Sequence, residues 1–238
     1  MDRLTHVKAV GAVPTWGCTQ DRTETEGIVM ARVRVHNFTI TLDGIAAGPG
    51  QRLDAPFGDG MDKVHDWMEV AQADRAAGKS GLGADRIDGY AEGVGATIMG
   101  RNMFGPQRGA WEDESWTGWW GDNPPYHHDT FVLTHHLRPS IPMEGGTTFH
   151  FTDEPIEAVL ERALKAAGGR DVVIAGGAHT VQQYLRAGLI DELNLVIAPI
   201  LAGSGEHLFD DVANALGAFQ VTEMVSDPSA TFVRLERQ

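Results

Sequence analysis

The chain has very little cysteine and no long hydrophobic run. Cys18 is the single cysteine among 238 residues. One cysteine cannot form an internal disulfide, and no Cys/His cluster has the spacing of a zinc site. No stretch approaches the roughly 18 apolar residues that a membrane-spanning helix needs. We therefore do not expect a disulfide-stabilised secreted domain, a zinc domain or a membrane protein. We expect a cytoplasmic protein.

Positive charge is also scarce. Lysine and arginine together number 19 against 33 aspartates and glutamates, which gives a formal net charge of -14. The electrostatic field of this negative charge repels nucleic acids and anionic lipids, so we expect neither as a partner. An anionic ligand would need local donors to overcome the repulsion, such as helix N-termini and isolated arginine or histidine side chains.

Several common enzyme motifs are missing. The glycine-rich stretches 81–86 and 203–208 lack the third glycine and the strand-to-helix context of a Rossmann fingerprint. No Walker loop, Gly-x-Ser-x-Gly elbow or His-Glu-x-x-His occurs, which disfavours kinases and hydrolases. The histidine pairs 127–128 and 135–136 are adjacent residues, whose side chains point to opposite faces of an extended segment. We expect no metal site.

The first part of the chain differs from the rest. Residues 1–30 are polar in their second half and show no hydrophobic period. This pattern predicts an N-terminal extension that is disordered or not native, although a strand over 7–13 is an alternative. The folded domain is then expected to cover 31–238.

Beyond residue 30, strand-like and helix-like segments alternate. The predicted strands are 31–40, 95–100, 131–134, 147–151, 171–175 and 193–201; the predicted helices are 61–77, a segment opening at Pro155 with Asp153 or Glu154 as its cap, and one opening at Ala178; 79–88 and 105–129 are predicted loops, and 219–224 with 230–236 a closing hairpin. This order predicts an α/β fold of three layers, α/β/α, with a mostly parallel central sheet and an antiparallel hairpin at its C-terminal edge.

One strand-to-helix junction is suited to anions. Gly176 and Gly177 follow the predicted strand 171–175, and Ala178 and His179 open the next helix. The N-terminus of a helix carries unpaired N–H groups and a partial positive charge, and glycines let phosphates approach the backbone. A simple tight turn is the alternative interpretation.

Two further junctions carry donors. Gly100, Arg101 and Asn102 follow one predicted strand, and Thr134 and His135 follow another. A guanidinium suits phosphate, although an ordinary surface arginine is equally compatible with the first pattern. Because ligands of open α/β sheets bind beyond the carboxyl ends of the strands, the three junctions together indicate one long anionic ligand.

Six short motifs in order resemble one family. They are TLDGIAAGP (41–49), MGRNMFG (99–105), VLTH (132–135), IAGGA (174–178), GLIDEL (188–193) and PILAGSG (199–205). This succession resembles the dihydrofolate reductase superfamily, and most closely the branch that contains the C-terminal reductase domain of bacterial riboflavin biosynthesis. The similarity extends over about 32–236.

The resemblance implies a fold, a cofactor and a site. It implies NADPH as hydride donor and a homodimer. It assigns the cofactor's phosphates to Gly100, Arg101 and Asn102, its adenosine end to Thr134 and His135, its pyrophosphate to Gly176, Gly177, Ala178 and His179, and its nicotinamide to Ala46 and Ala47.

The working hypothesis is hydride transfer from NADPH to a small, flat, conjugated molecule. Trp67 would hold that molecule together with the tryptophan-rich segment 105–129, which otherwise fills the core. Asp43 would organise the proton, or else form a turn. Residues 54–74 hold five Asp and one Glu against Lys63, so a phosphorylated substrate is not expected. The alternatives are an NADPH-binding protein without turnover and a structural dimer without cofactor.

Overall fold

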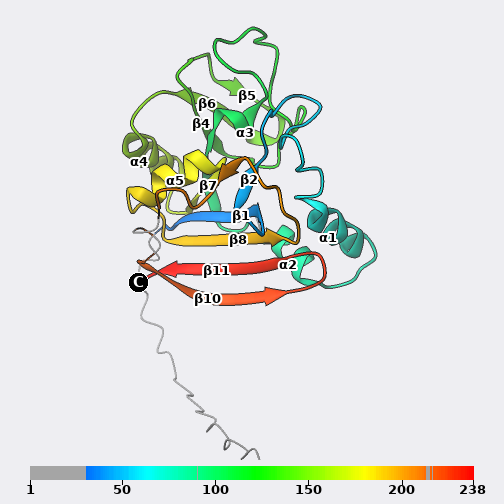
Figure 1. The fold of residues 1–238 in the computed structure, drawn as a ribbon. Coiled ribbons are helices and arrows are strands. Elements are labelled where there is room, and N and C mark those ends of the chain that lie inside the picture. The colour runs from blue at the N-terminus through cyan, green and yellow to red at the C-terminus, as the bar shows by residue number, and fades with distance from the viewer. Residues whose placement is uncertain (1–30, 90, 213–214, 216) are drawn as a thin grey trace, which may run out of the picture.

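A large sheet forms the centre of the molecule. The computed structural model describes residues 31–89, 91–212, 215 and 217–238. A nine-stranded sheet has the order β10-β11-β8-β1-β7-β3-β4-β6-β5 (Figure 1). Its strands are β1 (Val33–Thr41), β3 (Val94–Gly100), β4 (Asp129–Leu133), β5 (Ile141–Pro142), β6 (Thr148–Thr152), β7 (Asp171–Gly176), β8 (Glu192–Ala198), β10 (Phe219–Ser226) and β11 (Thr231–Arg237). Short strands β2 (Ile45–Ala47) and β9 (Glu206–His207) form a separate ladder.

The direction of the strands confirms the predicted architecture. All neighbouring pairs from β8 through β1, β7, β3 and β4 to β6 are parallel. At one edge β11 is antiparallel to β8 and β10 to β11, and at the other edge β5 is antiparallel to β6. The mostly parallel sheet and the antiparallel C-terminal hairpin are therefore as expected from the sequence.

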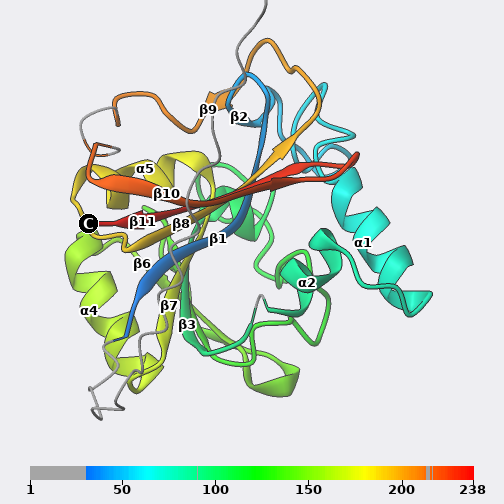
Figure 2. The same cartoon turned by 90° about the horizontal axis from the view of Figure 1, so that it is seen from below.

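Helices cover both faces of this sheet. The helices are α1 (Asp66–Ala76), α2 (Leu82–Asp88), α3 (Arg101–Phe104), α4 (Ile156–Ala167) and α5 (Ala178–Arg186), with a 3-10 turn, η1 (Glu144–Gly146). Seen from the hairpin edge in Figure 2, α4 and α5 lie to one side of the strands, and α1 and α2 to the other.

Alternating side chains of the strands explain the two covered faces. On β3, Ile98 packs with residues of α4 and α5, whereas the next residue, Met99, packs with Phe104 of α3. Since neighbouring side chains of a strand point to opposite faces, α3 lies across the sheet from α4 and α5. Trp67 of α1 packs with Val196 of β8 in a further cluster.

Some predicted element boundaries were wrong. The first helix begins at Asp66 rather than residue 61, and 82–88 forms α2 instead of a loop. Leu82 and Ile87 of α2 pack against the cluster around Trp67, so tertiary burial overrides the helix-weakening glycines nearby.

The N-terminal end of α4 also differs from the prediction. Pro155 itself is the N-cap residue, and no side chain caps the helix. The Glu154 carboxylate is occupied by the hydroxyl of Thr152, at 2.9 Å, and by Arg162. The predicted extension 1–30, and the alternative strand within it, lie outside the described residues. None of the helices described is long and apolar enough to cross a membrane.

Candidate functional site

The carboxyl ends of the neighbouring strands β3 and β7 form the junction at which a ligand-binding crevice is expected in such a sheet. The helices that follow them, α3 and α5, pack on opposite faces, which is the arrangement that opens a ligand-binding crevice in α/β sheets. Met99 pairs with Gly176. A Cβ added to Gly100 would lie 2.5 Å from Thr180 Oγ1 and 3.7 Å from the backbone nitrogen of Gly177. The two predicted glycine junctions therefore meet in space.

The N-terminus of α5 lies at this junction, and the first N–H groups of a helix have no partner within the helix. Gly177 is its N-cap residue, the preceding peptide bond from Gly176 is cis, and no side chain caps the helix. Ala178 is buried and His179 is exposed. A carboxylate oxygen of Glu206 lies 3.9 Å from where a Cβ of Gly177 would be. The helix terminus favours an anion and the nearby carboxylate opposes one.

At the end of β3 the donor is a side chain rather than a helix terminus. Helix α3 has only four residues, so its macrodipole is small. The guanidinium of Arg101 stacks on Trp111, 3.7 Å from the ring centroid, and one of its nitrogens donates to the carbonyl oxygen of Gly109. Its Nε and Nη2 are buried without a hydrogen-bond partner. Desolvation, with the charges of Arg108 and Arg138, lowers the Arg101 pKa.

Arg138 joins this cluster, although the sequence reasoning did not select it as a site residue. Its guanidinium lies 4.8 Å from the Trp111 centroid and donates to the carbonyl oxygen of Trp116 at 3.0 Å, while its Nε is buried and unpartnered. Within the described part of the chain, none of Arg101, Arg108 and Arg138 forms a salt bridge. In the sequence, the one sign of Arg138 is its place in the basic run 134–138 after β4. The contact with Trp111 could not be predicted, because the segment 105–129 that carries Trp111 has no periodic pattern.

The predicted adenosine end, Thr134 and His135, lies beside this cluster. Leu133, at the end of β4, pairs with Gly100. The buried Thr134 hydroxyl accepts from the backbone N–H of His136 at 3.1 Å, and Trp111 Nε1 donates to the carbonyl oxygen of His136 at 2.7 Å. Thr134 thus shapes the turn, while His135 is exposed. Asn102 is half-buried and follows Arg101 on α3.

The predicted nicotinamide residues, Ala46 and Ala47, belong to β2. In its ladder with β9, Ala47 pairs with Glu206, the residue that approaches Gly177. The backbones are so close that a Cβ on Gly205 would lie 2.1 Å from the carbonyl oxygen of Ala47. The structure therefore places β2 at the same crevice as the start of α5.

Asp43 is fully engaged in local hydrogen bonds. Its carboxylate accepts from the hydroxyl of Thr41 at 2.5 Å and from the backbone N–H groups of Ala202 at 3.1 Å and Gly203 at 2.7 Å. The Thr41 hydrogen bond, then those from Gly203 and Ala202, lower the Asp43 pKa to about 2. A carboxylate that stays ionised and saturated with donors favours a structural role, the turn alternative, over organising a proton.

Trp67 does not present a face to a ligand, which corrects the prediction that it holds the substrate. Its side chain is only 2% exposed, its Nε1 donates to the Thr39 hydroxyl at 3.1 Å, and its ring packs edge-on against Phe232. The tryptophan-rich segment 105–129 is likewise anchored in the core: Trp116 donates to the carbonyl oxygen of Phe104 at 3.1 Å. These contacts favour core filling over a lid.

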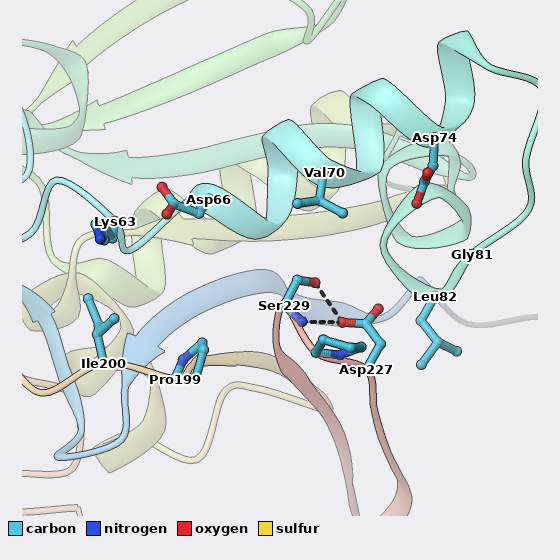
Figure 3. Close-up of a pocket in the computed structure, with 11 residues that line it drawn as sticks. Lys63, Asp66, Val70, Asp74, Gly81, Leu82, Pro199, Ile200, Asp227 and Ser229 are labelled. Carbon is cyan, nitrogen blue, oxygen red and sulfur yellow. Dashed lines mark hydrogen bonds between the residues drawn. The ribbon is translucent and has the colours of Figure 1, made fainter.

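A separate open cleft lies beside α1. It has a volume of about 720 Å³ and runs between α1, the end of β8 and the β10–β11 turn (Figure 3). Asp66 and Asp74 line it from α1, and Asp227, whose carboxylate accepts from Ser229, lines it from the turn, against one ammonium, Lys63. This charge disfavours an anionic cofactor, and none of the residues predicted to bind the cofactor lines the cleft.

Comparison with known proteins gives the family. The sequence model of the RibD C-terminal domain matches residues 33–226. The chain belongs to the RibD C-terminal domain family. The resemblance stated from the sequence motifs is thus confirmed.

Two individual relatives match this chain over shorter segments than the family model does. The chain is 32% identical over 91 residues to YwjB, an uncharacterized protein of Bacillus subtilis, covering 33% of this chain and 52% of YwjB. It is 41% identical over 49 residues to the uncharacterized YyaP of the same organism, covering 21% and 26% of the two chains. The chain thus spans about half or less of these relatives.

Solved structures support the fold. A putative riboflavin biosynthesis protein from Shewanella sp. PV-4 matches with a TM-score of 0.55 and 23% identity, covering 88% of this chain and 99% of that one. A diaminohydroxyphosphoribosylaminopyrimidine deaminase/5-amino-6-(5-phosphoribosylamino)uracil reductase from Thermotoga maritima gives 0.52 and 14%, covering 88% and 57%. These matches support the fold of the RibD C-terminal domain family, with the mostly parallel α/β architecture expected from the sequence.

Proposed function

We propose that the protein is an NADPH-dependent reductase whose cofactor lies across the carboxyl ends of β4, β3, β7 and β1. The observation that carries this proposal is the cluster of Arg101 and Arg138 around Trp111. Three guanidinium nitrogens of this pair are buried and unpartnered, on a chain with a net charge of -14. Buried donors without partners are unusual in folded proteins, and phosphate oxygens are the acceptors that suit them.

The donors are distributed along the crevice in the order that a dinucleotide needs. Arg101 and Arg138 would hold a phosphate at the β3–β4 end, and the N–H groups after Gly177 would hold the pyrophosphate. Ala46 and Ala47 of β2 would border the nicotinamide, which supplies the hydride when bound. Positive partners for a ribose phosphate favour NADPH over NADH, since NAD sites use a carboxylate there.

The acceptor is proposed to be a small, uncharged, flat molecule. The acidic segment before and along α1, with Asp62 and Asp66 exposed beside a single ammonium of Lys63, disfavours a phosphorylated acceptor. We also propose a homodimer, which the family resemblance implies, and a cytoplasmic location, which the single cysteine and the lack of a long hydrophobic run favour.

Titration with NADPH and NADH tests this function. Binding to the folded state raises the melting temperature by mass action, by an amount equivalent to about 2.7 kcal/mol at a hundredfold excess over Kd. We expect a larger rise with NADPH than with NADH, and loss of nicotinamide absorbance once an acceptor is added. Binding without oxidation across acceptors would favour the alternative, a binding protein without turnover, and no thermal shift would refute both.

A further inference from the structure

A buried histidine nitrogen before α1 has no hydrogen-bond partner among the residues that the structure describes. Nδ1 of His65 is shielded from solvent and accepts or donates no hydrogen bond. Desolvation lowers the His65 pKa to about 4, so the imidazole is neutral at neutral pH. Buried polar atoms are normally hydrogen-bonded, so this nitrogen is available to bind a ligand or a water molecule.

The surroundings of His65 connect it to β2. Ile45 of β2 packs with Met61 and Val64 in one buried cluster just before α1. The backbone N–H of Gly48, directly after β2, donates to the carbonyl oxygen of Phe57 at 2.8 Å. The Phe57 ring lies over the His65 ring, with centroids 4.2 Å apart. His65 is therefore adjacent to the end of β2, covered by Phe57.

His65 contacts the loop after β2 and is not one of the residues that line the open cleft. Asp66, Val70 and Asp74 line that cleft, whereas His65 packs under the loop that leaves β2. β2 pairs with β9, and Glu206 of β9 approaches Gly177. With the nicotinamide beside β2, as proposed above, His65 would be close to the acceptor. The inference that follows rests on the proposed function.

The chemistry of the surroundings limits what His65 can bind. Phe57 supplies an aromatic ring from a residue that is 43% exposed, and Met61 and Val64 are apolar and buried. The carboxylate of Asp59, paired with Arg52 at 2.6 Å, and the exposed Asp62 give the loop a negative charge. A flat, uncharged ligand with a hydrogen-bond acceptor fits a neutral N–H donor beside an aromatic ring.

We propose that His65 contacts the hydride acceptor, an uncharged planar carbonyl compound, by donating a hydrogen bond from Nδ1 to its carbonyl oxygen. Reduction of such a compound consumes one hydride and one proton. Negative charge develops on the carbonyl oxygen, where the N–H of His65 stabilises it, and water supplies the proton. Phe57 moves aside or stacks on the ring of the acceptor to admit it.

Menadione is a suitable probe, since it is planar, uncharged and carries carbonyl oxygens. Its affinity is measured by calorimetry for the complex with NADP+, where no turnover occurs, and its KM and kcat by NADPH oxidation. The variants are His65→Phe, which keeps a ring without nitrogen, and His65→Asn, whose amide N–H lies near the position of Nδ1. NADPH affinity and melting temperature are recorded for each.

We expect NADPH affinity within about twofold in all three proteins. His65→Phe should weaken menadione binding and raise KM about 5- to 30-fold, the equivalent of one hydrogen bond, with a lower kcat. His65→Asn should recover affinity to within about threefold of the wild type.

Three results would overturn the assignment while leaving the cofactor site intact: wild-type menadione affinity in His65→Phe, an equal loss in both variants, or no binding of menadione by a wild type that binds NADPH. The first two remove His65 from the acceptor site or reduce its role to packing. The third rejects the carbonyl class. If the wild type does not bind NADPH, the proposed function fails instead.

Discussion

Replacing Arg101 by methionine separates cofactor binding from folding. Methionine keeps the unbranched apolar stem of the side chain but removes the guanidinium, with its charge and all five N–H donors. In the protein without ligand, Arg101 has two buried nitrogens without partners and lies near the charges of Arg108 and Arg138. Arg108→Met is the matched control, because the Arg108 side chain is exposed and bonds to Gln51 at 3.3 Å.

The expected effects on binding and on stability differ. A hydrogen bond to a charged group contributes about 1.5–3 kcal/mol, so Arg101→Met should weaken NADPH binding about 10- to 150-fold. Removal of the stacking on Trp111 costs about 0.5–2 kcal/mol, while removal of a desolvated charge near two other cations offsets that loss. Unfolding free energy without ligand should therefore change by no more than about 1 kcal/mol.

Calorimetry with NADPH and with NADH, combined with urea unfolding of each variant, measures both quantities. Arg108→Met should change NADPH affinity by less than about threefold, because an exposed charge acts mainly through a screened field. The reasoning would be refuted if Arg101→Met bound NADPH as tightly as the wild type. A loss of affinity matched by Arg108→Met would also refute it, since only the general field would then matter.

Three further predictions concern Glu206, the buried histidines and Gly100. Glu206→Gln should tighten NADPH binding about two- to fivefold, because it removes a negative charge near the start of α5; calorimetry in low salt checks this, and weaker binding would contradict it. Burial lowers the pKa of His65 and of His128 from 6.5 to about 4. The unfolded chain therefore binds protons that the folded protein does not, and unfolding free energy should fall as pH drops from about 6.5 to 4. Urea unfolding across this range should show that unfolding free energy depends less steeply on pH in His65→Phe than in the wild type. An unchanged dependence on pH would show that the pKa of His65 is not lowered by folding. Gly100→Ala should lower unfolding free energy by about 1–3 kcal/mol, because its Cβ would overlap the Thr180 hydroxyl, and Thr180→Ala in the same chain should restore part of it; simple additivity of the two changes would argue against that clash.

Local sequence patterns predicted the positions of strands and helices where the hydrophobic period and the positions of glycines agree. The strand 171–175 and the glycines after it were expected, and β7 with the start of α5 follows them closely. The αL conformation of Gly168, which ends α4, was also signalled by its position after an apolar helical stripe. Such features depend on neighbours within one or two turns, which a sequence displays directly.

Features that depend on distant partners were missed. The ladder of β2 with β9 joins residues about 160 positions apart, and strands of three and two residues are too short to show a period. Trp67 was expected to face a ligand. An aromatic residue on an amphipathic helix can lie toward a core or toward a cleft, and the helical spacing does not distinguish the two. Its contacts with Phe232 of β11 decide the matter, and the helical spacing alone does not contain them.

The sequence by itself determined the class of fold and the chemistry available at the strand ends: glycines, one helix start and a few cations on an acidic chain. Only the tertiary structure decided which of those groups meet, because the order of strands in the sheet sets which carboxyl ends are neighbours. It brought Gly100 to Gly177, moved Arg138 to Trp111 and buried His65 beneath Phe57. Contacts between segments far apart in the chain arise from packing of whole layers, and no local pattern encodes them.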